Sequence, residues 1–115
     1  MTVEEFYEQI GGNSQDVLKR FGSMTTAKRF IVRFLQDKSF SELENAMDEG
    51  LFDDAFRAAH TLKGVSINLG FGDLYRISSE VTELLRDKKA EEAEALLGAL
   101  RAEYEKVTAL APNVE

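Results

Sequence analysis

The sequence has no cysteine, no tryptophan and a single histidine, and its one proline, Pro112, lies close to the end. The lack of cysteine excludes disulfide bonds, thiolate metal sites and cysteine nucleophiles, and it is typical of a reducing compartment. No proline is present before Pro112 to interrupt a long helix. No apolar run approaches the roughly 20 residues of a membrane-spanning helix. These absences leave a soluble protein with long helices as the expectation.

Basic residues are also in the minority, with 14 Lys and Arg against 21 Asp and Glu, for a net charge of −7. A nucleic-acid-binding surface has to be basic to displace counterions, so nucleic-acid binding is not expected. An anionic membrane surface would repel the chain for the same reason. The first residues lack the basic and apolar regions of a signal peptide. We therefore expect a cytoplasmic protein that binds neither nucleic acid nor membranes.

A chain of 115 residues fits one domain, and a hydrophobic content of 43% is enough for a core. Apolar residues recur at intervals of three and four, and strand-like alternation is missing, so the pattern predicts an all-α fold. Short helices are expected over about residues 1–22 and a bundle core over about 25–109, within a single domain 1–115. Because the connections are short, we expect an antiparallel up-down four-helix bundle with additional short N-terminal helices.

Several helix ends have recognisable signals. Thr25 or Thr26 is expected to cap the third helix, and Ser39 with Glu42 reads as a capping box for the fourth. Asp73 is expected to cap the sixth helix, and the residues after the last helix are expected to fray. Gly70 and Gly72 are expected to break the helix before them. The third helix is expected to carry one apolar stripe, made of Ala27, Phe30, Ile31, Phe34 and Leu35.

The only histidine, His60, falls within a helix predicted from about Phe52 to Leu69. At roughly 100° per residue, one side of this helix collects the residues that should face the core: Ala55, Ala59, Leu62, Ser66 and Leu69. The opposite side collects residues that should face water: Asp53, Arg57, Thr61, Gly64 and Asn68. His60 lies between the two sides, with Phe56, Lys63 and Ile67 beside it. The imidazole is therefore expected to be exposed on the shoulder of the bundle.

An exposed neutral imidazole is a good nucleophile at neutral pH. A phosphoryl group on it would add negative charge, and Lys63 is placed to offset that charge as a flexible cation. Gly64 inside a helix costs about 0.8–1 kcal/mol relative to alanine, which makes sense if a partner has to approach the backbone beside His60. An ordinary surface histidine next to a solvated lysine stays open as the simpler interpretation.

The run Ala59-His60-Thr61-Leu62-Lys63-Gly64, followed by Asn68-Leu69-Gly70, resembles the signature of histidine-containing phosphotransfer (HPt) domains of bacterial phosphorelays. The turn Glu49-Gly50-Leu51-Phe52 is also similar, and the resemblance spans roughly Thr25 to Val107. It implies a four-helix bundle without kinase activity. His60 would accept a phosphoryl group from one receiver-domain aspartate and pass it to another. Lys63 would stabilise that group, and Gly64 would clear space for the receiver.

The resemblance also implies the partners, which are response-regulator receiver domains and a hybrid sensor histidine kinase. Magnesium would be bound by the receiver, and no cofactor is expected on this chain. Val65 and Ile67 are larger than the small residues that the family often has there. Because Ile67 lies beside His60 on the helix, it is expected in the docking surface together with Arg57 and Phe56, although core packing is an equal expectation for Phe56.

Two alternatives share much of this pattern. The chain could be a helical module that binds receiver domains without being phosphorylated, or the phosphoacceptor module of a larger sensor kinase. A di-iron bundle needs Glu-x-x-His pairs on two helices, and a chain with one histidine does not supply them. The acidic surface and the lack of an obvious apolar patch favour a monomer.

Overall fold

The computed structural model describes all residues, 1–115, and it confirms the all-α fold. The helices in chain order are α1 (Val3–Gln9), α2 (Ser14–Phe21), α3 (Met24–Arg33), the 3-10 helix η1 (Phe34–Gln36), α4 (Ser39–Glu49), α5 (Phe52–Leu69), α6 (Gly72–Arg86), α7 (Ala90–Leu110) and the 3-10 helix η2 (Ala111–Asn113). None of these helices combines the length and apolar character that crossing a membrane requires.

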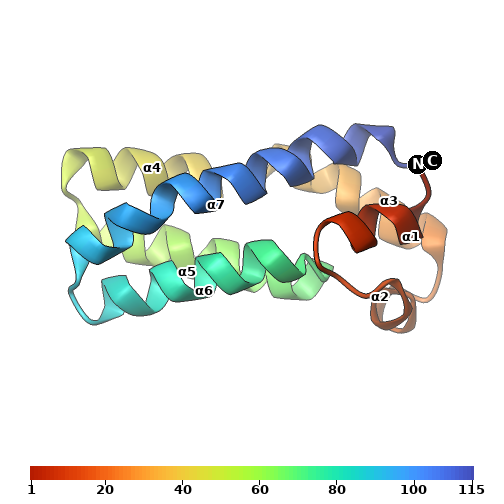
Figure 1. The fold of residues 1–115 in the computed structure, drawn as a ribbon, viewed down its shortest axis with the longest axis horizontal. Coiled ribbons are helices and arrows are strands. Elements are labelled where there is room, and N and C mark those ends of the chain that lie inside the picture. Colours follow the sequence, from red (N-terminus) through yellow and green to blue (C-terminus); the bar gives the residue numbers. More distant parts are fainter.

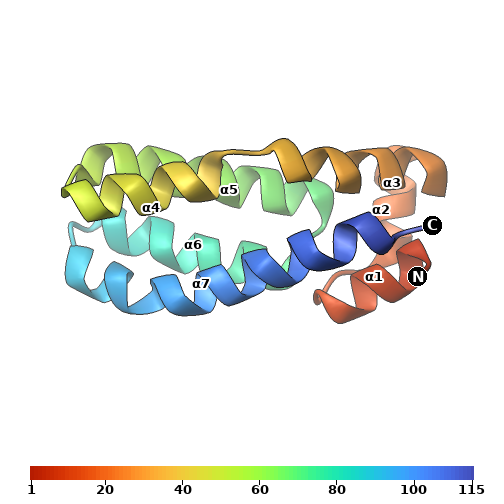
Figure 2. The same cartoon turned by 90° about the horizontal axis from the view of Figure 1, so that it is seen from above.

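Helices α4 to α7 form an antiparallel bundle in which each helix packs on the next and α4 also contacts α7 (Figure 1). The molecule is elongated, with extents of 40 × 22 × 18 Å. Figure 2 shows α3 continuing along the same edge of the molecule as α4, while α1 and α2 lie at the end of the bundle reached by α3. The N-terminal helices therefore extend one end of the bundle.

A single hydrophobic cluster of 26 buried residues runs through the bundle and the N-terminal helices. At the end near the termini its largest members are aromatic and meet edge to face. The ring centroids of Phe71 and Phe6 are 5.9 Å apart, and those of Phe71 and Phe34 are 5.1 Å apart. Phe34 also lies 5.9 Å from Tyr104. These contacts connect α1, η1, the α5–α6 loop and α7 in one core.

Glycines allow the α1–α2 loop to lie directly against the α5–α6 loop. A side chain on Gly12 would collide with the Gly70 carbonyl oxygen, and one on Gly72 would collide with that of Gly11. Gly70, at φ +75°, ends α5 as expected. The expectation that Gly72 also breaks a helix is wrong, because Gly72 is the first residue of α6.

The expected caps of α3 and α4 are also wrong. The backbone is extended at Ser23, so its side chain accepts a hydrogen bond from Thr26 N at 3.2 Å, whereas Thr25 and Thr26 already lie inside the helix. At the start of α4, Asp37 Oδ1 accepts hydrogen bonds from both Ser39 N, at 2.9 Å, and the Ser39 hydroxyl. Ser39 is therefore a donor to a cap and not the cap itself.

Asp73 does not cap α6 either. It lies in the first turn, where its carboxylate pairs with Arg76 at 3.4 Å. The apolar stripe predicted for α3 is only partly buried, because Phe30 and Leu35 are each 38% exposed.

The C-terminal residues do not fray. Residues 111–113 form η2, and Val114 is 5% exposed. Glu115 N donates a hydrogen bond to Met1 O, and the Met1 amino group donates one to Asn113 O, both at 2.8 Å. The two termini lie side by side in both views (Figures 1 and 2). The end of the chain is held because the N-terminus pairs with it.

Candidate functional site

Helix α5 spans Phe52–Leu69, the range predicted from the sequence. Its buried face consists of small and aliphatic residues: Ala55, Ala58, Ala59, Leu62, Ser66 and Leu69. This confirms the expected core side and adds Ala58 to it. His60 is exposed, as predicted, so its imidazole is accessible to a partner molecule.

Phe56 lies directly beside the imidazole. The two rings are stacked, with centroids 5.9 Å apart and planes 14° from parallel. The guanidinium of Arg86 on α6 also contacts the phenyl ring, and its carbon lies 5.0 Å from the ring centroid. Phe56 is half-buried and also packs against the core. The core-packing expectation for Phe56 is therefore correct, and its ring also forms part of the surface around His60.

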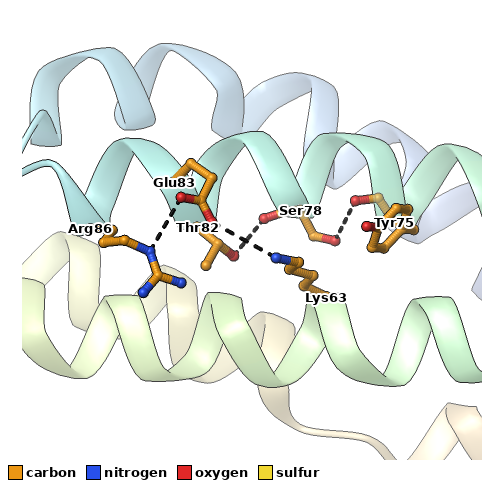
Figure 3. Close-up of polar contacts among 6 residues, drawn as sticks. All are labelled: Lys63, Tyr75, Ser78, Thr82, Glu83 and Arg86. Atoms are coloured by element: carbon orange, nitrogen blue, oxygen red, sulfur yellow. Dashed lines mark hydrogen bonds and ion pairs between the residues drawn. The ribbon is translucent and has the colours of Figure 1, made fainter.

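Lys63 points from α5 toward α6, where it meets a carboxylate (Figure 3). Its Nζ lies 3.8 Å from Glu83 Oε1, and Arg86 Nε donates to the other oxygen, Oε2, at 3.2 Å. The hydroxyls of Ser78 and Thr82, drawn in the same figure, donate to carbonyls of their own helix, α6. The ion pairs on this flank of His60 are therefore made by Lys63, Glu83 and Arg86, while the two hydroxyls bond only within α6.

On the other flank of His60 the helix surface is open. A Cβ added to Gly64 would have no atom within 4 Å, so packing within this molecule does not explain the glycine. Arg57 is exposed and pairs with Asp54 one turn earlier in α5. Ile67 is 47% exposed, and it lies one helical turn beyond Lys63 and Gly64. The backbone beside His60 is thus accessible at Gly64, with an exposed apolar side chain nearby.

In a comparison with known families, residues 35–110 match the family model described as "Hpt domain". The chain belongs to the Hpt domain family. No curated protein and no solved structure gives a significant match. Hpt domains take part in phosphotransfer in two-component signalling and interact with receiver domains and kinases. They are phosphocarriers without intrinsic kinase activity.

The matched segment of this Hpt domain contains helices α4 to α7, and α1 to α3 lie before it. Two side chains from these earlier helices nevertheless hold the C-terminal end of α5. Arg20 Nη1 donates to the carbonyl oxygens of Ile67 and Asn68, at 2.7 and 2.6 Å. The buried Tyr7 hydroxyl donates to Leu69 O at 2.7 Å. A cation at the carboxyl end of a helix is also favoured by the helix dipole.

Sequence reasoning on this Hpt domain missed Glu83, Arg86 and Arg20. Glu83 and Arg86 are three residues apart on one helix, a spacing that predicts an ion pair between them. It does not predict which helix faces His60, because that depends on how α5 and α6 pack. Arg20 had no sequence signal at all, since the residues it contacts are 47 and 48 positions away.

Proposed function

We propose that this Hpt domain is a phosphoryl carrier in which His60 accepts the phosphoryl group of a receiver-domain aspartate and donates it to the aspartate of another receiver. The observation that carries the proposal is the exposed imidazole on α5 beside the open backbone at Gly64. Receiver domains of response regulators and of a hybrid sensor kinase are the partners, with this chain acting as a cytoplasmic monomer. Phe56, Arg57 and Ile67 form the docking surface around the histidine.

The transfer is a simple displacement at phosphorus. One ring nitrogen of the neutral imidazole attacks the phosphorus of the aspartyl phosphate, and a nitrogen–phosphorus bond forms. The bond from phosphorus to the aspartate oxygen breaks, and the electron pair leaves with the carboxylate. The proton on the other ring nitrogen stays on the ring. Lys63 offsets charge on the phosphoryl group, Gly64 leaves room for the receiver backbone, and the magnesium ion belongs to the receiver.

The substitution His60→Gln tests this proposal. The natural protein is expected to take up label from a phosphorylated receiver and to hold it in an acid-labile, alkali-stable form, as expected for phosphohistidine. The His60→Gln variant is expected to take up none. Because His60 is exposed, the variant should fold normally, which a circular dichroism melting curve checks.

Two results would contradict the proposal. If no receiver domain from the same genome labels the natural protein, His60 is not a relay residue. If receivers bind the natural protein and His60→Gln equally and neither takes up phosphate, the chain is an interaction module without phosphotransfer. The phosphoacceptor module of a larger sensor kinase would show the same chemistry at His60.

A further inference from the structure

Two cations, one from each of two neighbouring helices, meet at a single carboxylate beside His60. Lys63 of α5 approaches one oxygen of Glu83 at 3.8 Å, and Arg86 of α6 donates to the other at 3.2 Å (Figure 3). The Glu83 carboxylate therefore lies between two positive charges, at a position where another anion could also bridge them. This arrangement is not explained by the core, because the Glu83 and Arg86 side chains are about half exposed.

The convergence follows from the antiparallel packing of α5 and α6. Long side chains lean toward the N-terminus of their own helix. Since the two helices run in opposite directions, Lys63 and Arg86 lean toward each other along the shared flank. A second contact also holds Arg86 in this position, since its guanidinium carbon lies 5.0 Å from the centroid of the Phe56 ring. The same phenyl ring stacks on His60, with centroids 5.9 Å apart, so Arg86 and the imidazole share Phe56 as a neighbour.

We propose that Arg86 is the second cation that binds the phosphoryl group on His60, and that Glu83 holds both Lys63 and Arg86 until that group replaces it. The inference rests on the proposed phosphorylation of His60. A phosphoryl group carries more negative charge than one carboxylate, and a guanidinium fork matches phosphate oxygens well. Glu83 and Arg86 are each about half exposed, so the exchange needs only side-chain rotation.

The chain contains a matched control at a site remote from histidine. Arg101 of α7 pairs with Glu44 of α4, and its guanidinium carbon lies 5.6 Å from the centroid of Phe40. As at Arg86, an arginine here pairs with a carboxylate and lies over a phenyl ring, but without a phosphoacceptor. Substitutions at Arg101 and Glu44 therefore measure the general effect of removing a stacked arginine or its carboxylate partner.

The test follows the ionisation of the phosphoryl group itself. The full chain is phosphorylated chemically with phosphoramidate: the phosphorus–nitrogen bond of the reagent breaks, ammonia leaves, and phosphorus becomes bonded to the imidazole. The apparent pKa of the phosphoryl group is then read from its 31P resonance as the pH is varied above neutrality and just below it. Phosphoramidate makes the measurement independent of any receiver domain.

Arg86→Ala is expected to raise the apparent pKa of the phosphoryl group by about 0.2–0.7 pH units, the size of an exposed charge–charge interaction. Glu83→Gln is expected to lower it by a similar amount, because a negative charge is removed. Arg86→Lys should retain most of the natural value. Arg101→Ala and Glu44→Gln should leave it unchanged. A purely structural role would not give opposite signs for Arg86→Ala and Glu83→Gln.

The inference is overturned if Arg86→Ala titrates like the natural protein, or if Arg86→Ala and Glu83→Gln shift the pKa in the same direction. Labelling of His60 by phosphoramidate but by no receiver would refute the proposed relay function, while the titration would still decide the role of Arg86. If phosphoramidate does not label His60 either, both proposals are wrong. Melting curves of all variants separate these results from unfolding.

Discussion

Gly64 and Gly72 are both glycines, but for different physical reasons. Gly72 begins α6 where the α1–α2 loop lies against it, and a Cβ would collide with the Gly11 carbonyl. Gly64 lies inside α5 and faces open space. The fold therefore requires a glycine at position 72 but not at position 64. The free-energy cost of Gly64 is not explained by packing within this molecule, and the proposed approach of a receiver domain would account for it.

Gly64→Ala is expected to increase the free energy of unfolding by about 0.8–1 kcal/mol, because alanine is the better helix former and meets no neighbour. Gly64→Gln is expected to slow phosphotransfer from a receiver, since the longer side chain fills the space beside His60. Urea denaturation and transfer kinetics measure the two effects.

Gly98 in α7 is the matched control, because it also lies inside a helix with nothing within 4 Å of an added Cβ. Gly98→Ala should stabilise the fold by a similar amount, and Gly98→Gln should leave transfer unchanged. Equal transfer rates for the Gln variants at positions 64 and 98 would show that Gly64 has no role in receiver access.

At the scale of single helices, periodicity predicted α5 well, whereas the N-caps expected for α3, α4 and α6 were wrong. Caps depend on the backbone angles of one or two residues outside the helix, as the extended Ser23 shows at α3. The end of α5 depends on even more distant residues, since Tyr7 and Arg20 bond to its last carbonyls. The helix that carries His60 is therefore positioned by α1 and α2 as well as by the bundle.

Tyr7→Phe is expected to destabilise the protein at neutral pH by about 1 kcal/mol, because the Leu69 carbonyl loses a buried hydrogen bond. The variant should also respond less to alkali. Burial raises the pKa of the Tyr7 hydroxyl well above its usual value, and nearby Arg20 only partly opposes this. Above about pH 10 the unfolded chain loses that proton while the folded protein keeps it, so stability falls as the pH rises.

Urea denaturation at neutral pH and at several values above pH 10 measures this dependence. The loss of stability with rising pH should be smaller in Tyr7→Phe than in the natural protein. Some loss should remain, because burial and the Asp37 carboxylate also raise the pKa of Tyr104. Identical alkaline slopes in the two proteins would show that Tyr7 ionises as it does in the unfolded chain.

At the scale of the whole molecule, the bundle and the N-terminal helices form one structure closed by the chain ends. Phe71, in the loop after the His60 helix, contacts aromatic rings of α1 and η1. The last residues return to Met1, and Val114 is buried there. The family match begins only at residue 35, yet the residues before it share the core of the matched segment.

Val114→Ala is therefore expected to lower the free energy of unfolding by about 1–2 kcal/mol, through the loss of two buried methyl groups. Val32→Ala makes the same chemical change at a valine that is 41% exposed, and it should cost much less. Urea denaturation compares the two variants. A cost for Val114→Ala no larger than that for Val32→Ala would mean that the chain end frays in solution.

The all-α class, the bounds of α5 and the exposure of His60 with Lys63 and Gly64 near it could all be predicted from the sequence. These features depend on spacings of three and four residues, which a helix turns directly into shared faces. Three features could not be predicted in this way: Glu83 and Arg86 lie on the helix flank next to the histidine, Tyr7 and Arg20 hold the end of its helix, and the two termini pair. Those contacts join residues far apart in the chain, and helix packing, not local periodicity, brings them together.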